Sequence, residues 1–216
     1  MQFTDQEQEL TELVENILTE AKRQGADETE VSVSVDQGLG VRVRKGELEN
    51  LEFNQDRGFG ITLYFGKRKG TASTTDSSAS AIHDTVTAAK NIARNTEEDP
   101  CNGLADASLM PSNAMDLDTY HPWDVEPEHA AELAIECEAA GLAVDARLTN
   151  SDGAQISSQQ AMRLYGNSHG FIGAYRGTRH SLSCVLIGED ENGMQRDYWY
   201  TVARQSKDLE SPAVVG

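Results

Sequence analysis

The sequence predicts an α+β protein in which a helix followed by an antiparallel β-meander is arranged twice, giving two mixed α/β subdomains. Two observations lead to this fold class. Stretches with apolar residues three and four apart precede longer stretches in which apolar and polar residues alternate one by one. Turn residues, often glycines, separate the alternating runs, as is typical of antiparallel meanders. Residue identity between the halves is slight, so we interpret the repeat as one of architecture.

The first helix is expected close to the N-terminus and ends at Gly25, a typical C-terminal stop. Thr4 to Glu7 fit a capping box, in which the Thr4 hydroxyl and the Glu7 carboxylate bond to amides of the first turn. One helical face carries the apolar residues Leu10, Leu13, Val14, Ile17, Leu18 and Ala21. The polar face is acidic, which disfavours a membrane surface as its partner.

Short strands are predicted from Val31 to Thr75, with glycine turns between them. The predicted turns are Lys45-Gly46, Asp56-Arg57-Gly58 and Gly66-Lys67. A second helix follows, with Asp76 or Ser77 as its N-cap. Its apolar stripe consists of Ile82, Val86, Ala89 and Ala93, whose mostly small side chains allow close packing on a sheet.

The second half repeats this order. Pro127 fits the first turn of a third helix, where its missing N–H costs nothing. The inner stripe of this helix is Ala130, Leu133, Ala134, Cys137 and Ala140, so Cys137 is expected in the core. Strands are predicted at 154–158, 160–166, 171–175, 178–187 and 194–204. The turns between them are Ser151-Asp152-Gly153, Asn167 to Gly170, Arg176-Gly177 and Glu189 to Gly193.

Composition changes between the halves, where an acidic stretch holds most of the prolines. We therefore divide the chain into an N-terminal helix–meander–helix subdomain over residues 1–96, a connector over 97–126, and a second helix–meander subdomain over 127–216. The last residues resemble neither a cap nor a disordered tail, so we expect the natural chain to continue beyond Gly216.

Charge and composition exclude several function classes. The formal net charge of −18 disfavours direct nucleic-acid binding, which depends on basic groups that neutralise phosphate. No apolar run approaches the roughly 20 residues of a membrane span, and the N-terminus has no signal-peptide pattern. The three cysteines form no CxxC pair, so neither a zinc knuckle nor a disulfide framework is indicated. A cytoplasmic protein is the simplest interpretation.

A search for catalytic groups gives little. The five histidines include no H-E-x-x-H motif, and prolines split the cluster from His121 to His129 across a loop and a helix start. Cys184 is the only candidate nucleophile. Its neighbour on the same strand face, His180, is four residues and roughly 13 Å away, which is too far for a hydrogen-bonded dyad. We therefore expect Cys184 to be a core residue.

The remaining candidate site is Tyr175 to Ser181, which carries two arginines and a histidine in an otherwise acidic chain. Because arginine suits bidentate recognition of carboxylate, Arg176, Arg179 and His180 are the candidate peptide-binding residues. A solvated hairpin turn, or a salt bridge to a nearby acid, would explain the same residues without a binding role.

Several stretches resemble the TldD/PmbA family, and in particular its PmbA-type (TldE-type) members. They follow the family order along almost the whole chain: RVRKGELENLEFNQDRGFGITLYFGKRKGTASTTD, DPCNGLADASLM, DLDTYHPWDVEPEHAAELA, RLTNSDGAQISS, YGNSHGFIGAYRGTRHSLSCVLI and RDYWYTVAR. Family chains are longer, so the resemblance implies the N-terminal half of a PmbA-type chain, with the family's C-terminal domain outside this sequence. Glu126 departs from the Ser or Thr N-cap expected before Pro127.

The resemblance implies a cytoplasmic subunit that assembles with a TldD-type partner, as a dimer or hetero-oligomer, into a metal-dependent peptidase for extended or unfolded peptides. Associated roles are maturation of peptide antibiotics such as microcin B17 and degradation of antitoxins. The family's zinc motif, H-E-x-x-x-H, belongs to the TldD-type partner. No such motif occurs here, so no zinc ligand, cofactor or catalytic residue is carried over to this chain.

Two other functions stay open. The family was once described as modulators of DNA gyrase, and an acidic chain could compete for a basic DNA-binding surface without proteolysis. A self-contained hydrolase that uses Cys184 is the third and weakest hypothesis.

Overall fold

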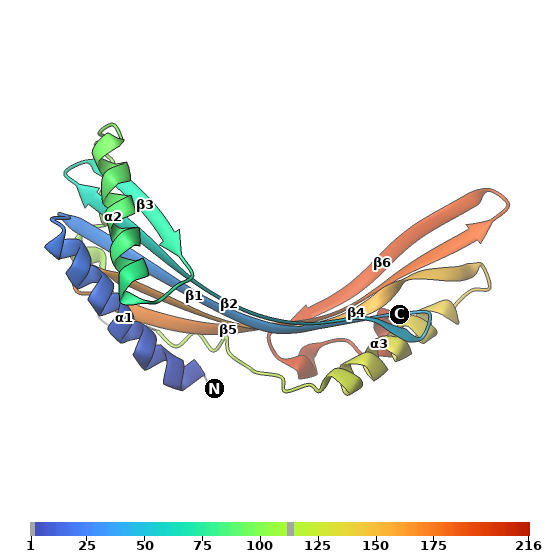
Figure 1. The fold of residues 1–216 in the computed structure, drawn as a ribbon. Coiled ribbons are helices and arrows are strands. Elements are labelled where there is room, and N and C mark those ends of the chain that lie inside the picture. Colours follow the sequence, from blue (N-terminus) through green and yellow to red (C-terminus); the bar gives the residue numbers. More distant parts are fainter. Residues whose placement is uncertain (1–2, 112–114) are drawn as a thin grey trace. The chain divides into compact units, whose positions relative to one another are not determined.

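A computed structural model describes residues 3–111 and 115–216, with side chains from Gln6 onward. The elements of the described residues, labelled in part in Figure 1, follow one another as α1 (Phe3–Arg23), β1 (Glu28–Arg44), β2 (Glu47–Phe65), β3 (Arg68–Thr74), α2 (Ala79–Asn95), the 3-10 helix η1 (Ala107–Leu109), α3 (Pro127–Leu142), β4 (Leu148–Asn167), β5 (Ile172–Asp190), β6 (Gly193–Ala203), the 3-10 helix η2 (Ser206–Asp208) and α4 (Pro212–Val215).

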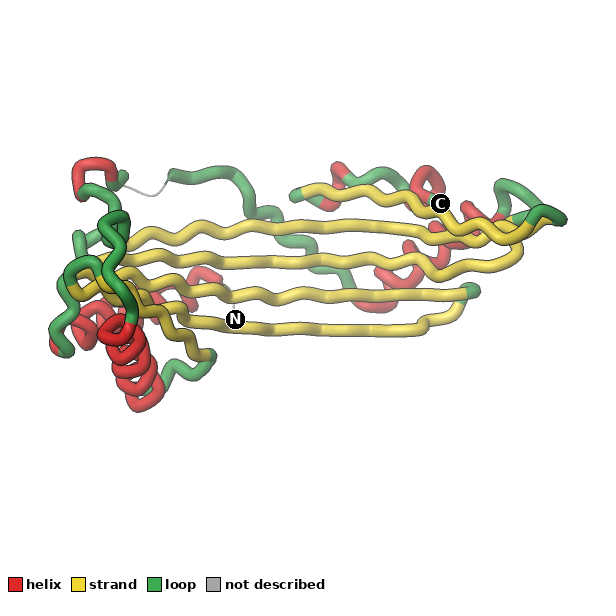
Figure 2. The backbone as a smooth tube through the Cα atoms, turned by 90° about the horizontal axis from the view of Figure 1, so that it is seen from above, coloured by secondary structure: helices red, strands yellow, loops and turns green. Residues whose placement is uncertain are grey.

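The strands of the described residues form one six-stranded sheet, in the order β3-β2-β1-β4-β5-β6 (Figure 2). Strands β2 and β3 pair antiparallel, with Phe59 opposite Thr74 and Phe65 opposite Arg68. Strands β5 and β6 also pair antiparallel. Helices and an antiparallel sheet confirm the predicted α+β class.

The chain divides into two compact units, each discontinuous in sequence. Unit 1 consists of Met1–Val35, Asp56–Leu117 and Met162–Tyr175, and unit 2 of Asp36–Gln55, Asp118–Ala161 and Arg176–Gly216. Strands β1, β2, β4 and β5 thus give residues to both units. The contiguous subdomains 1–96 and 127–216, with the connector 97–126, stay a prediction of the sequence.

Unit 1 has the two predicted amphipathic helices. Helix α1 buries Leu10, Val14, Ile17 and Ala21, and helix α2 buries Ile82, Thr85, Val86, Ala89 and Ala93. Helix α2 lies against β3 so closely that a Cβ on Gly70 would come within 2.0 Å of the Ala89 carbonyl oxygen. The small residues of the predicted stripe therefore permit contact between helix backbone and strand backbone.

The two predicted N-caps have different outcomes. The capping box at Thr4 depends on a side chain outside the described residues. The prediction of Asp76 or Ser77 as the cap of α2 is wrong, because Ser78 is the cap and accepts a hydrogen bond from the Ala81 amide. Asp76 instead accepts from the Ser78 amide at 2.8 Å and so orders the turn before the helix.

In unit 2, helix α3 begins at Pro127 as predicted and packs its small residues on the sheet. Ala130, Ala134 and Cys137 are completely buried there, together with strand residues such as Val41, Ile156 and Cys184. Cys137 and Cys184 are thus core residues, as the sequence predicted. The short helix α4 lies against α3, where a Cβ on Gly141 would come within 2.5 Å of the Gly216 carbonyl oxygen.

A buried carboxylate on α3 holds the turn between β1 and β2. Glu138 is 1% exposed, and its two oxygens accept the backbone amides of Lys45 at 2.9 Å and Gly46 at 2.8 Å. Both turn residues have positive φ, 54° at Lys45 and 76° at Gly46. The carboxylate therefore satisfies the two amides of a turn that costs strain at Lys45, which is not a glycine.

Glycine predicted turns correctly at Lys45-Gly46 and Gly66-Lys67, which lie between strands, and at Asn167 to Gly170 and Glu189 to Gly193, which span strand ends and the turns between them. The predictions at Asp56-Arg57-Gly58, Ser151-Asp152-Gly153 and Arg176-Gly177 are wrong, because these residues lie inside β2, β4 and β5. At Gly58 the missing side chain leaves room for the Ser34 hydroxyl, which would lie 3.3 Å from a Cβ. Glycine there serves close packing across strands rather than a turn.

No helix in the described part of the chain is both long enough and apolar enough to cross a bilayer.

Candidate functional site

The hairpin of β5 and β6 forms the candidate site in unit 2. Its register runs from His180 opposite Ala203 to Asp190 opposite Gly193. Gly193 has a φ of 125°, which suits glycine and closes the hairpin. Strand β6 is the last strand of the sheet order, so its outer edge has no strand partner among the described residues.

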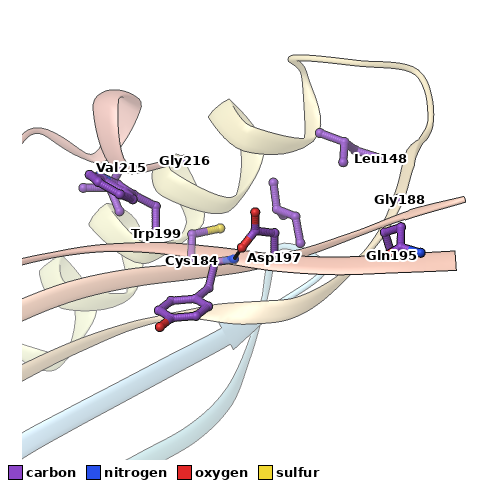
Figure 3. A pocket seen from close by; sticks show the side chains of 10 residues that line it. Leu148, Cys184, Gly188, Gln195, Asp197, Trp199, Val215 and Gly216 are labelled. Carbon is purple, nitrogen blue, oxygen red and sulfur yellow. Dashed lines mark hydrogen bonds between the residues drawn. The ribbon is translucent and has the colours of Figure 1, made fainter.

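A pocket of about 390 Å³ lies on one face of this hairpin. Three successive cross-strand pairs line it, Cys184 with Trp199, Leu186 with Asp197, and Gly188 with Gln195. Leu148, Tyr198, Val215 and Gly216 complete the lining. Figure 3 shows Trp199, Val215 and Gly216 toward one end, Leu148, Gly188 and Gln195 toward the other, and Cys184 and Asp197 between them. The lining is mainly apolar, with one carboxylate and one side-chain amide.

Strand β6 also exposes aromatic side chains beside the pocket. Tyr198, Trp199 and Tyr200 are 61%, 58% and 52% exposed, and the rings of Tyr198 and Tyr200 stack with centroids 6.3 Å apart. The Trp199 indole N–H donates to the Glu210 carboxylate at 3.2 Å, which fixes the ring. Exposed aromatic residues on an unpaired edge are typical of a surface that binds another chain.

The structure separates the three predicted peptide-binding residues. Arg179 is exposed, whereas Arg176 is half-buried and its guanidinium lies 5.9 Å from the centre of the Tyr120 ring. His180 is completely buried. Because side chains alternate along a strand, Arg176 and His180 point to one face of β5 and Arg179 to the other. The binding role of these residues stays a prediction.

His180 has a clear packing role. Its Nε2 lies 2.9 Å from the His121 carbonyl oxygen, so this nitrogen carries the proton. Nδ1 then accepts from the Ser158 hydroxyl at 3.0 Å, and the Trp123 ring meets the imidazole edge to face at 5.5 Å. The imidazole thereby joins the segment of His121 and Trp123 to β4 and β5. A buried serine and histidine in this arrangement are not accessible to a substrate.

Cys184 has a cysteine as its partner, not a base. The Cys137 thiol donates a hydrogen bond to the Cys184 sulfur, and this bond together with burial raises the pKa of Cys137 well above its ordinary value. The same bond lowers the pKa of Cys184, but both thiols are buried in the core. His180, the neighbour considered from the sequence, uses both nitrogens elsewhere. The arrangement therefore gives no support to a cysteine hydrolase.

The described residues contain no group of three or more His, Cys, Asp or Glu placed to hold a metal ion. The two histidines of the cluster from His121 to His129 pair with acids outside it. His121 lies 3.4 Å from the Asp118 carboxylate, and His129 lies 3.3 Å from the Glu132 carboxylate. Each histidine has its own acidic neighbour, so the cluster is not a single ligand set.

The sequence did not indicate the aromatic edge or the pocket. Residues 198–200 are Tyr-Trp-Tyr, and from this run we predicted a strand but not its exposure at the edge of the sheet. The signal that could have found the site is this run itself, because three adjacent large rings cannot all face the core of a strand.

Two family models match the chain. The "PmbA/TldA metallopeptidase domain 1" matches residues 29–93, and the "PmbA/TldA metallopeptidase central domain" matches residues 120–216. The metalloprotease PmbA of Escherichia coli O157:H7 is 48% identical over 191 residues, which are 88% of this chain and 42% of that protein. A metalloprotease PmbA homolog of Haemophilus influenzae is 45% identical over 98% of this chain and 47% of that protein. The chain thus spans about half the length of the curated relatives it matches.

Solved structures have the same fold. A crystal structure from Bacteroides thetaiotaomicron, described as a candidate modulator of DNA gyrase, gives a TM-score of 0.86 at 20% identity, over 94% of this chain and 47% of that one. TldE from Thermococcus kodakarensis gives 0.77 at 15% identity, over 94% of this chain and 45% of that one. At these identities the likeness concerns the fold alone.

Proposed function

The chain belongs to the PmbA/TldA metallopeptidase family, and from this premise we propose that it is part of a noncatalytic, PmbA-type subunit of a cytoplasmic, metal-dependent peptidase. The substrates we propose are extended or unfolded peptides, such as peptide-antibiotic precursors and antitoxins. Relatives that are named metalloproteases support the reaction class.

The observation that carries the peptide-binding role is the outer edge of β6. An extended peptide can add a strand to such an edge, where main-chain hydrogen bonds give affinity that tolerates many sequences. The exposed rings of Tyr198, Trp199 and Tyr200 would cover its side chains. This mode of binding suits a subunit that presents unfolded peptides to a catalytic partner.

The described side chains of this chain do not fit a zinc ion, since they offer no group of three candidate ligands. The sequence of residues 1–216 also contains no H-E-x-x-x-H motif. We therefore assign the zinc to a TldD-type partner subunit, and assign to this chain the binding and orientation of the peptide. Assembly with that partner would be as a heterodimer or larger hetero-oligomer.

Cleavage of an unfolded peptide tests this function. The protein in its natural length is assayed alone, with a TldD-type subunit, and with that mixture plus a chelator. We expect cleavage only in the chelator-free mixture, because metal and motif come from the partner. Cys184→Ala should still cleave in the mixture, because Cys184 supplies no reacting group.

Cleavage by this protein alone would contradict the noncatalytic role. A second candidate function, modulation of DNA gyrase without proteolysis, is favoured by the description of one structural neighbour and by the net charge of −18. Binding to gyrase with no cleavage in any mixture would support that function in place of the peptidase role.

A further inference from the structure

The pocket beside β6 has an apolar wall and one carboxylate midway along it, and we propose that it holds a long basic side chain, lysine or arginine, of the bound peptide. This inference rests on the proposed peptide-binding function and names a preference within it. Lysine and arginine combine an aliphatic stem, which apolar walls can cover, with a cationic end that needs a carboxylate.

The apolar wall accounts for the stem. Cys184 and Leu186 on β5, Leu148 at the start of β4, and Val215 on α4 surround the space. Its volume of about 390 Å³ lies within the range of ligand pockets, roughly 300–1,000 Å³. Gly188 contributes no side chain, and a Cβ there would meet only ordinary contacts, the nearest 3.4 Å away on Leu148. Neither the backbone conformation nor close packing requires a glycine at position 188, and the missing side chain leaves the pocket open there.

The carboxylate midway along the pocket accounts for the charge. Asp197 lines the pocket opposite Leu186, beside the Gln195 amide. A second cavity, of about 240 Å³, adjoins it through the shared residues Leu148, Gly188 and Gln195, and its charged lining is Asp145, Arg147, Glu189 and Asp190.

The only basic residue of the two linings is already engaged. The Arg147 guanidinium lies 2.8 Å from the Asp145 carboxylate. The charge of Asp190 also acts on Arg147. Asp197 and Glu189, in contrast, form no ion pair with a cation of either lining. Arg196, on the opposite face of β6, is paired with Asp152 at 2.8 Å. The local field therefore favours a cation and disfavours an acidic side chain.

The register brings a peptide side chain to this place. Gln195, Asp197 and Trp199 share one face of β6 because side chains alternate along a strand. In a strand added to the outer edge of β6, every second side chain points to that same face and lies beside this row. One residue of the peptide would thus reach the pocket.

Binding of three synthetic peptides, identical except for one central residue, tests the preference by calorimetric titration of the protein in its natural length. The central residue is lysine, norleucine, which is the uncharged analogue, or glutamate. We expect the lysine peptide to bind about tenfold more tightly than the norleucine peptide, and the glutamate peptide to bind most weakly.

Two variants locate the effect. Asp197→Asn should remove the preference for lysine over norleucine while the norleucine peptide binds as before. Gly188→Leu should fill the pocket and weaken both peptides by about tenfold. Glu191→Gln, in the exposed hairpin turn outside both linings, is the matched control and should bind as wild type.

The results separate the inference from the function on which it rests. Equal binding of the lysine and norleucine peptides, or a lysine preference that survives Asp197→Asn, overturns the basic side-chain pocket and leaves peptide binding intact. No binding of any peptide by the wild-type protein contradicts the proposed function itself. Thermal unfolding of Gly188→Leu itself, at the temperature of the wild-type protein, shows that its weakened binding does not come from misfolding of the strand.

Discussion

Glu138→Ala is expected to lower the free energy of unfolding by about 3 kcal/mol, since it removes a buried carboxylate that accepts two amides of the turn between β1 and β2. The Lys45 and Gly46 amides bond to the two oxygens of this carboxylate at 2.9 and 2.8 Å. The turn that they form has positive φ at Lys45, which costs free energy. The hydrogen bonds to the carboxylate offset this cost, and the variant loses them. Urea denaturation of the variant and the wild type measures the loss.

Acid should have part of the same effect on the wild-type protein. Burial raises the pKa of Glu138, but hydrogen bonds from Ser151, Gly46 and Lys45 and the charge of Arg44 outweigh burial, so the pKa lies below its ordinary value of 4.5. A carboxyl group with a lowered folded-state pKa stabilises the fold above its unfolded pKa, about 4.5. This stability is lost as the pH falls through the lower, folded-state pKa. Glu138→Gln should lack this component of the acid-induced loss.

The control is Glu136→Ala, which removes an exposed carboxylate two residues away on the same helix. Its free energy of unfolding should stay within about 0.5 kcal/mol of the wild-type value. A loss as large as that of Glu138→Ala would mean that helix propensity or net charge, and not the buried carboxylate, determines the effect.

Gly70→Ala is expected to cost about 2 kcal/mol, because one added methyl group forces α2 away from β3. The new Cβ would lie 2.0 Å from the Ala89 carbonyl oxygen and 2.4 Å from the Ala93 amide nitrogen. Both contacts are with helix backbone, so no rotation of a side chain relieves them. Thermal unfolding followed by circular dichroism measures the change.

Gly188→Ala is the matched control, since it makes the same substitution on a strand where the nearest atom is 3.4 Å from the new Cβ. It should be neutral or slightly stabilising, because alanine restricts the unfolded chain more than glycine does. Equal destabilisation by the two substitutions would contradict the close packing of α2 on β3.

The sequence predicted those parts of the fold that depend on local pattern. The apolar spacing of α1 and α2 predicted their buried faces, since a helical period of 3.6 residues is visible along the chain. Lys45-Gly46 predicted a hairpin turn for the same local reason. These features need no knowledge of distant residues.

Continuity of the strands was not predictable in this way. Gly58 and Gly177 look like turn residues in sequence, yet both lie inside long strands. A glycine can form a turn, or it can lie inside a strand and leave room for a side chain of the neighbouring segment. For Gly58 that side chain is the Ser34 hydroxyl. The sequence alone does not say which segments face one another.

The candidate site shows the same limit. Alternation along a strand already places Arg179 on the other face from His180. The burial of His180, however, depends on Ser158 and His121, which are 22 and 59 residues away. The exposure of Trp199 likewise depends on β6 being the edge of the sheet, and strand order is not visible in the pattern of residues.

The central claim is that an extended peptide pairs with the outer edge of β6, and amide hydrogen exchange with an uncleaved peptide bound tests it most directly. Exchange should slow in β6, over residues 194–202, because outward-facing amides gain partners in the peptide. The amides of α2, which lie in unit 1, serve as the internal reference and should exchange as in the free protein. Unchanged exchange in β6, with protection elsewhere on binding, would contradict the claim.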